Sequence, residues 1–217
     1  MSNRGARAGW LAIPLVLLAR TTPASAQFGI RGGVNLSKFV GEDAGSESVA
    51  GLNLGASIPL IKIGRLSIGP EVYYAKKGGE FDPATAESFE FELSYIEVPL
   101  LARLTIPLSG PLAMYVGGGP VYGWNLSCEF SAASDPGETA RECGQQFSSF
   151  DTAMESADKG IVFNAGLNLP VLGGFGGLNL DARLVRGMDR LVDSDSGSNP
   201  DIKNQAFTLM LGYYLGR

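Results

Sequence analysis

The sequence contains no histidine and only two cysteines, and only 18% of its 217 residues are charged. Without histidine the chain cannot build Ser/His/Asp or Cys/His catalytic arrangements, and it lacks the side chain that most often exchanges protons near pH 7. Most transition-metal sites also use histidine. We therefore expect a protein that is not an enzyme and that carries no cofactor.

Long hydrophobic runs are also missing, and the longest falls well short of the ~18 residues of a membrane-spanning helix. That run, Trp10–Ala19, follows two arginines and precedes Ala24-Ser25-Ala26. A basic start, an apolar centre and a small-x-small end are typical of a secretory signal peptide cleaved before Gln27. The alternative is a buried or amphipathic first helix, which Pro14 disfavours. We expect residues 1–26 to be a signal peptide and residues 27–217 one domain.

Positive charge is scarce as well. Removal of residues 1–26 takes away three arginines and no acid, so 17 basic and 22 acidic residues become 14 and 22, a net charge of −8. Because nucleic-acid binding depends on cationic contacts to phosphates, this balance disfavours a nucleic-acid partner.

The dominant pattern in the rest of the chain is a hydrophobic period of two. For example, Ile161, Phe163 and Ala165 alternate with Asn164 and Gly166. Such alternation indicates strands with one apolar and one polar face. Eight segments show it: 28–37, 50–58, 66–74, 95–104, 112–125, 161–169, 178–184 and 206–213.

The connections between these segments alternate in length. They are short after the second, fourth and sixth segments and long and polar after the others, the longest running from about Cys128 to Asp158. Short turns at one end and long loops at the other are typical of transmembrane barrels. Because the long connections hold most of the acidic residues, we expect a negatively charged outer rim.

The composition of the polar face indicates which side of the barrel meets lipid. A soluble barrel of the lipocalin kind would place its apolar face inward and many Lys and Glu outward. Here the polar face is mostly Gly, Asn, Ser and Thr, which suits a narrow interior where glycines leave room for tyrosines. Aromatic residues near the strand ends of the apolar face would form an interfacial girdle: Tyr74, Tyr122, Trp124 and Tyr213. We expect an all-β, eight-stranded antiparallel up-and-down transmembrane β-barrel.

A few charged residues fall on the inward face at comparable depths, with Glu97 higher. They are Arg31, Glu71, Glu97, Arg103, Asp181 and Arg183. Three arginines and three acids balance, and an unpaired charge in a narrow lumen would cost several kcal/mol, so we expect a paired network that fills the lumen. The alternative is a selectivity ring in a conducting pore.

Two smaller motifs lie in the long connections. Cys128 and Cys143 occur in the longest connection of an exported chain, so we expect a disulfide. Asp193, Asp195 and Asp201 offer alternating oxygen ligands and weakly resemble a calcium loop, although the closing glutamate is absent. A solvated, turn-rich loop explains that segment better, so we expect no metal.

Five segments resemble the eight-stranded outer-membrane β-barrel family of Gram-negative bacteria, the porin-family or PorT-like proteins, and more distantly the OmpA/OmpX-type barrels. They are residues 28–37, 69–74, 93–100, 180–183 and 211–215. The resemblance implies an outer-membrane location, contact with outer-membrane lipid and lipopolysaccharide, and insertion by the barrel-assembly machinery. It does not identify an activity, because one fold carries many functions.

We therefore expect a non-enzymatic outer-membrane barrel with a side-chain-filled lumen, whose acidic loops serve envelope structure or contact an unidentified external partner. One alternative is a narrow porin for small solutes. Another is a secreted, soluble, lipocalin-like barrel that binds a ligand. An outer-membrane enzyme is a third alternative that the absence of histidine disfavours.

Overall fold

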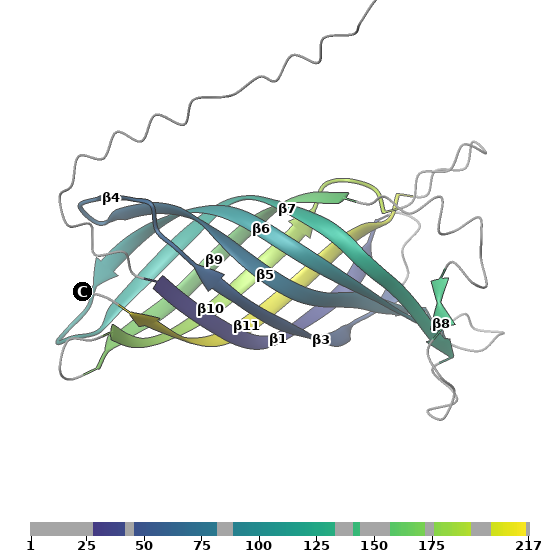
Figure 1. Ribbon diagram of the computed structural model, residues 1–217, viewed down its shortest axis with the longest axis horizontal. Helices are drawn as coiled ribbons and strands as arrows, with labels where there is room; N and C mark the ends of the chain where they lie inside the picture. Colours follow the sequence, from purple (N-terminus) through teal and green to yellow (C-terminus); the bar gives the residue numbers. More distant parts are fainter. Residues whose placement is uncertain are drawn as a thin grey trace, which may run out of the picture.

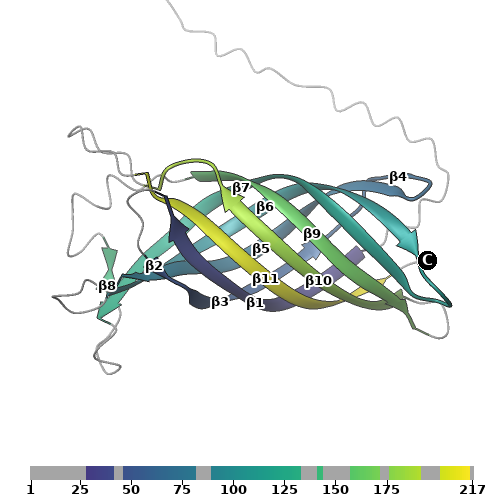
Figure 2. The same cartoon turned by 180° about the vertical axis from the view of Figure 1, so that it is seen from behind.

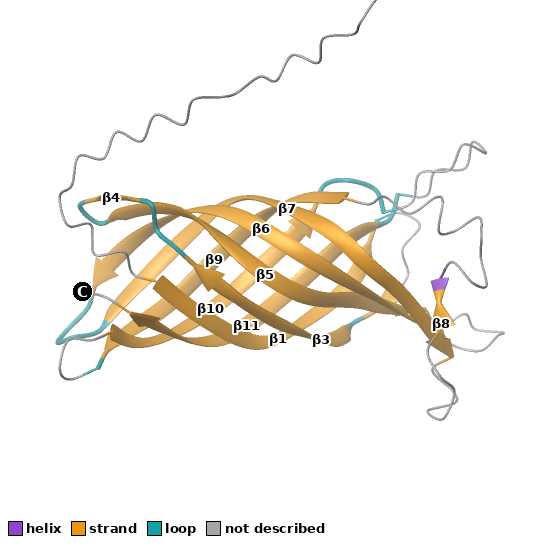
Figure 3. Cartoon of the chain, viewed as in Figure 1, coloured by secondary structure: helices purple, strands orange, loops and turns teal. Residues whose placement is uncertain are grey.

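A computed structural model describes residues 28–41, 46–81, 89–132, 141–143, 157–171, 176–191 and 201–215. The expected signal peptide, residues 1–26, lies outside this part of the chain. The described residues are almost entirely strand (Figure 3), and none of their helices is long and apolar enough to span a membrane.

Eight long strands and three short ones form one sheet. The long strands are β1 (Phe28–Val40), β3 (Val49–Ser57), β5 (Leu66–Phe81), β6 (Phe89–Pro107), β7 (Ala113–Ala132), β9 (Ala157–Pro170), β10 (Gly176–Gly187) and β11 (Lys203–Leu215). The short strands are β2 (Ser46–Glu47), β4 (Ile61–Ile63) and β8 (Arg141–Glu142).

The long strands pair with their neighbours in chain order, and the sheet closes on itself. Every pairing is antiparallel, and β1 pairs with β11 along its whole length, from Phe28 opposite Leu215 to Val40 opposite Lys203. Closure gives both edges of the sheet a hydrogen-bonding partner, which is the condition for a β-structure to cross a lipid bilayer. The expected eight-stranded up-and-down barrel is confirmed.

The two ends of the barrel differ (Figures 1 and 2). At one end lie the C-terminus of β11 and the hairpin of β4 and β5, and at the other lie β2 and β8. Glycines with positive φ occupy two of the tight turns at the first end: Gly64 at 60° and Gly110 at 69°. Glycine adopts this left-handed conformation without the steric cost of a Cβ. We call this the turn end and the opposite end the loop end.

Strands β5, β6 and β7 extend past the barrel at the loop end (Figure 1). They are longer than the alternation predicted, because β5 runs on to Phe81 and β6 begins at Phe89. The pattern continues through these residues, since Phe89, Phe91 and Leu93 alternate with Glu90 and Glu92. Part of what we expected to be loop is therefore a three-stranded extension. A register shift on β7, opposite Ser94 and Tyr95, marks its start.

The outward face of the barrel is apolar and the inward face polar. On β10 and β11, Leu180 and Leu211 are 43% and 61% exposed, whereas Asp181 and Thr208 are almost fully buried. A secreted soluble barrel would have the reverse arrangement, with its leucines inside. The expected orientation, apolar residues outward and glycine and asparagine inward, is confirmed.

Candidate functional site

A charged cluster lies in the lumen toward the turn end, centred on the carboxylate of Glu71. Its Oε1 lies 2.8 Å from Nη1 of Arg31 and 2.5 Å from Nη2 of Arg103, and its Oε2 lies 2.7 Å from Nη2 of Arg183. These four residues come from β5, β1, β6 and β10, so they meet only because the sheet closes. One buried carboxylate thus pairs with three guanidinium groups inside the barrel.

A second carboxylate, Asp181, completes this cluster. It pairs with Nε of Arg183 and accepts a hydrogen bond from the hydroxyl of Tyr115. It also accepts one from the amide of Asn164 at 2.9 Å. The cluster therefore holds three cations and two anions, with neutral donors on the second carboxylate.

Tyrosines occupy the space between these charges, and glycines make that space. The hydroxyl of Tyr73 donates to Glu71 at 3.0 Å and accepts from Arg183 at 2.9 Å, and its ring lies 4.6 Å from the Arg183 guanidinium. A Cβ at Gly55 would lie 2.3 Å from the Tyr73 ring, and one at Gly166 would lie 2.3 Å from the Tyr115 hydroxyl. The tyrosine side chains therefore fit into the lumen because these inward-facing glycines have no Cβ.

An apolar layer lies next along the lumen toward the loop end. It consists of Leu101, Val121, Val162, Val185 and Ala206. All five are at most 6% exposed. On β6 and β10 the layer begins one inward position beyond Arg103 and Arg183, so it borders the charged cluster on this side of the lumen.

A second polar group follows the apolar layer. Glu97 pairs with Lys77 there, and the amide of Asn204 donates to Tyr95 at 3.2 Å and to Asp158 at 3.0 Å. Glu97 was expected in a network with the arginines, and the structure instead pairs it with a lysine. Neither Lys77 nor Asp158 was expected here, because the alternation was followed on β5 only to Tyr74 and on β9 only from Ile161. Including these two residues, the described lumen holds four cations and four anions.

Aromatic side chains gather at the loop end of the lumen. Phe39 stacks on Phe81 at 5.6 Å, Phe81 meets Phe91 edge-on at 5.9 Å, and Phe91 lies 6.3 Å from Phe130. Leu93 and Leu191 are buried against the same group. The three-stranded extension thus carries an apolar inner surface above the barrel.

The expected disulfide between Cys128 and Cys143 is present. It joins β7 to the residue after β8 and closes a ring with a sequence separation of 15. The bond lies beside the aromatic group, since Cys128 packs against it.

The four expected interfacial aromatics all point outward. Tyr74 pairs with Ile96, which pairs with Trp124, and the rings of Tyr122 and Trp124 lie 4.5 Å apart. Tyr213 lies near the turn end, opposite Ile30. Three aromatics therefore lie toward the loop end of the apolar face and one toward the turn end, and their place at the membrane interfaces stays a prediction.

The segment of the weak calcium hypothesis is described only at its end. Asp193 and Asp195 lie outside the described residues, and the Asp201 carboxylate lies 2.8 Å from Nζ of Lys203 and 3.8 Å from Nε of Arg190. The hydrogen bond from Lys203 lowers the pKa of Asp201, as expected for a carboxylate that already has a cationic partner. Within the ranges that the structure describes, no three His, Cys, Asp or Glu residues gather as a metal site would need.

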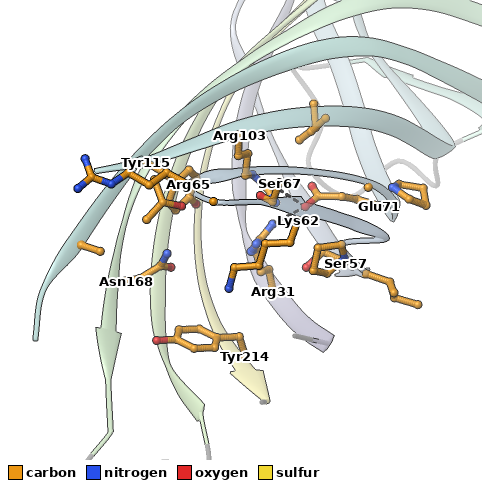
Figure 4. Close-up of a pocket in the computed structure, with 18 of the residues that line it drawn as sticks. Arg31, Ser57, Lys62, Arg65, Ser67, Glu71, Arg103, Tyr115, Asn168 and Tyr214 are labelled. Atoms are coloured by element: carbon orange, nitrogen blue, oxygen red, sulfur yellow. Dashed lines mark hydrogen bonds and ion pairs between the residues drawn. The ribbon is translucent and has the colours of Figure 1, made fainter. Parts of the chain in front are cut away.

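A cavity of about 400 Å³ lies below the charged cluster at the turn end (Figure 4). Its wall includes Arg31, Arg103, Lys62 and Arg65, and Glu71 and Leu101 lie at its inner end. The lining does not reach Lys77 or Glu97, so this cavity ends at the apolar layer.

The sequence matches a family model described as the outer membrane protein beta-barrel domain over residues 19–192. The chain belongs to this family. The matched region includes the charged cluster, the disulfide and four of the five residues of the apolar layer, but not β11, which carries the fifth, Ala206. No curated protein matches the chain significantly.

Several solved structures of outer-membrane barrels are similar to the chain. The attachment invasion locus protein Ail of Yersinia pestis is 15% identical with a TM-score of 0.44, covering 88% of this chain and 99% of its own. Neisserial surface protein A is 16% identical with a TM-score of 0.47, covering 88% and 97%. The outer membrane protein AlkL is 14% identical with a TM-score of 0.42, covering 100% and 96%.

Proposed function

We propose that the protein is a non-enzymatic barrel of the Gram-negative outer membrane whose lumen is sealed, and whose acidic loop end supports the envelope or contacts an external partner. One observation supports this proposal: paired charges and an apolar cluster follow one another along the lumen. The charged cluster lies on the turn side of the apolar layer, and the Lys77–Glu97 pair lies on the loop side.

Two physical barriers oppose ion flow through such a lumen. An ion that replaces Arg31 or Arg183 at Glu71 must break a buried pair, at a cost of several kcal/mol. It must then pass Leu101, Val162 and Val185, which offer no polar side-chain atom, so on this wall of the lumen nothing replaces its hydration shell. Together these barriers support a structural role for the charges.

Planar-bilayer recording tests the sealed lumen. We expect the refolded wild-type protein to give no stable conductance steps. The variant Leu101→Ala/Val185→Ala, which thins the apolar layer, serves as the comparison and should raise the frequency of brief openings. Stable, ion-selective steps from the wild type would contradict the proposal.

A narrow porin is the second candidate function, and a separate observation favours it. The cavity at the turn end enters the lumen as far as Leu101. In addition, the side-chain amides of Asn35 and Asn53 include buried atoms with no hydrogen-bond partner among the described residues. Such atoms could bind water along a solute path. Uptake of small sugars into liposomes containing the protein would support this candidate.

Cell fractionation tests the proposed location of the protein, and hydrolysis assays test its proposed lack of enzymatic activity. We expect the protein in the detergent-insoluble outer-membrane fraction, in contact with lipid and lipopolysaccharide, with gel mobility that changes on heating. Insertion by the barrel-assembly machinery predicts loss of this fraction when that machinery is depleted. We expect no hydrolysis of lipopolysaccharide or peptides by the refolded protein.

A further inference from the structure

The turn end of this acidic protein is positively charged. Among the described residues of that half of the barrel, the acids are Glu71 and Asp181, whereas the cations are Arg31, Lys62, Arg65, Arg103 and Arg183. Two carboxylates against five cations leave an excess of three positive charges. The whole chain, by contrast, has a formal charge of −5.

The excess charge faces the cavity of about 400 Å³. Four of the cations line it, and the one carboxylate in its wall, Glu71, is covered, because its side chain is 1% exposed while those of Arg31 and Arg103 are 9% and 16% exposed. A molecule that enters the cavity therefore meets guanidinium groups before it meets a carboxylate.

The two lumen arginines in the cavity wall are held by Glu71 through one terminal nitrogen each. Nη1 of Arg31 and Nη2 of Arg103 contact its carboxylate, and both side chains keep some exposed surface. Glu71, the acceptor nearest to both, is already shared with Arg183. The hydroxyl groups of Ser57 and Ser67 also line the cavity (Figure 4).

We propose that this cavity binds a phosphate-bearing anion between Arg31, Arg103, Lys62 and Arg65. Planar guanidinium groups match the oxygens of a phosphate in pairs, lysine adds a point charge, and hydroxyl groups donate to the remaining oxygens. The volume accommodates a phosphate with part of a headgroup or with water. The phosphate comes either from free solute or from an anionic lipid of the adjoining leaflet, and both carry the chemistry that the cavity recognises.

Titration of the folded protein with inorganic phosphate, in micelles of an uncharged detergent and at low ionic strength, tests the site. We expect saturable binding by calorimetry and broadening of the ³¹P resonance. The variant Lys62→Gln/Arg65→Gln should bind about tenfold more weakly, because it removes two cations from the mouth.

The matched control is Lys159→Gln/Arg190→Gln, which removes two exposed cations whose side chains are 64% and 53% exposed at the opposite end. This control should leave phosphate binding unchanged. Arg103→Lys keeps the charge but loses the planar fork, and it should weaken binding severalfold. Heat-modifiable gel mobility verifies that each variant is folded.

Nanodiscs distinguish the two sources. Selective broadening of the phosphatidylglycerol signal in mixed phosphatidylcholine discs, lost in Lys62→Gln/Arg65→Gln, identifies a lipid headgroup. Binding of inorganic phosphate without this preference identifies a free solute. Absence of both, or equal weakening by the two double variants, would overturn the proposal.

Discussion

At the scale of single residues, Glu71 pairs with more charged groups than any other side chain described in the lumen. Three arginines contact its two oxygens, and the side chain is 1% exposed. A buried ion pair adds little net stability compared with an apolar substitute, but removal of one partner leaves the other charged and unpaired. Replacement of Glu71 should therefore lower the free energy of unfolding more than replacement of any exposed acidic residue.

The first prediction follows for Glu71→Gln. Three guanidinium groups would then share only Asp181, and we expect the free energy of unfolding in lipid vesicles to fall by about 3–5 kcal/mol. Urea titration followed by tryptophan fluorescence measures it. Glu92→Gln is the control: its pair with Lys76, at 2.5 Å, is about one-third exposed, so the loss should stay below about 1 kcal/mol. Equal losses would show that the cluster does not depend on Glu71.

The second prediction concerns glycines of the inward face. At Gly166 an added Cβ would lie 2.3 Å from the Tyr115 hydroxyl and from the carbonyl oxygen of Leu180, whereas at Gly123 its nearest neighbours lie 3.5 Å away. Gly166→Ala should therefore cost about 1–3 kcal/mol of overpacking, and Gly123→Ala much less. The same urea titration compares them, and a larger loss for Gly123→Ala would contradict the packing.

Sequence alternation predicted which residues face inward but not which residues touch. Arg31, Arg103 and Arg183 were all expected in the lumen, and the structure brings them to one carboxylate. Glu97 was expected with them and instead pairs with Lys77. Pairing depends on the stagger between neighbouring strands, which glycine-rich segments specify weakly in the sequence.

At the scale of elements, the extension of β5, β6 and β7 lies outside the closed part of the sheet and has fewer strand pairings than the barrel. Beyond the barrel, β7 pairs on one side with β6 and on the other, among the residues that the structure describes, only with the two-residue β8. The Cys128–Cys143 disulfide fixes β8 beside β7. The bond should therefore stabilise this end locally and leave the barrel below unaffected.

The third prediction tests whether the disulfide stabilises the extension without affecting the barrel. In Cys128→Ser/Cys143→Ser, amide hydrogen exchange of Glu129 and Phe130 should accelerate, because a ring of this size contributes about 3 kcal/mol of local order. Amides of Val162 and Val185, in the apolar layer, should exchange at the wild-type rate. Faster exchange in that layer would show that the extension and the barrel unfold together.

The strand ends at this extension could have been predicted and were not. Phe89, Phe91 and Leu93 keep the period of two, but the predicted segment began at residue 95 and left them in a long, polar connection. The structure places those acids outward above the apolar band, where Glu92 meets Lys76. An alternating charged face is compatible with a strand once that strand leaves the lipid, so polarity alone does not mark its end.

At the scale of the whole molecule, the proposed membrane location depends on the leucines of the outward face. The closed meander and the apolar outer face followed from alternation and loop length, since a two-residue period admits only two faces. Leu180 lies near the middle of β10 between Leu167 and Leu211, and all three are at least 40% exposed. In water such a surface would drive association, whereas in a bilayer it contacts acyl chains.

The fourth prediction is that the cost of an outward charge depends on depth. Leu180→Arg should destabilise the folded barrel in vesicles by about 2–4 kcal/mol, because the guanidinium must leave water near the midplane. Leu126→Arg, at the bulge near the loop end where Leu126 is 56% exposed, should cost about 0–1 kcal/mol, because its charge reaches the interface. Urea titration of both variants in the same vesicles measures the difference. A soluble barrel would give both substitutions the same small cost, so equal values would place the molecule outside the membrane and remove the basis for a lipid-bounded, sealed lumen.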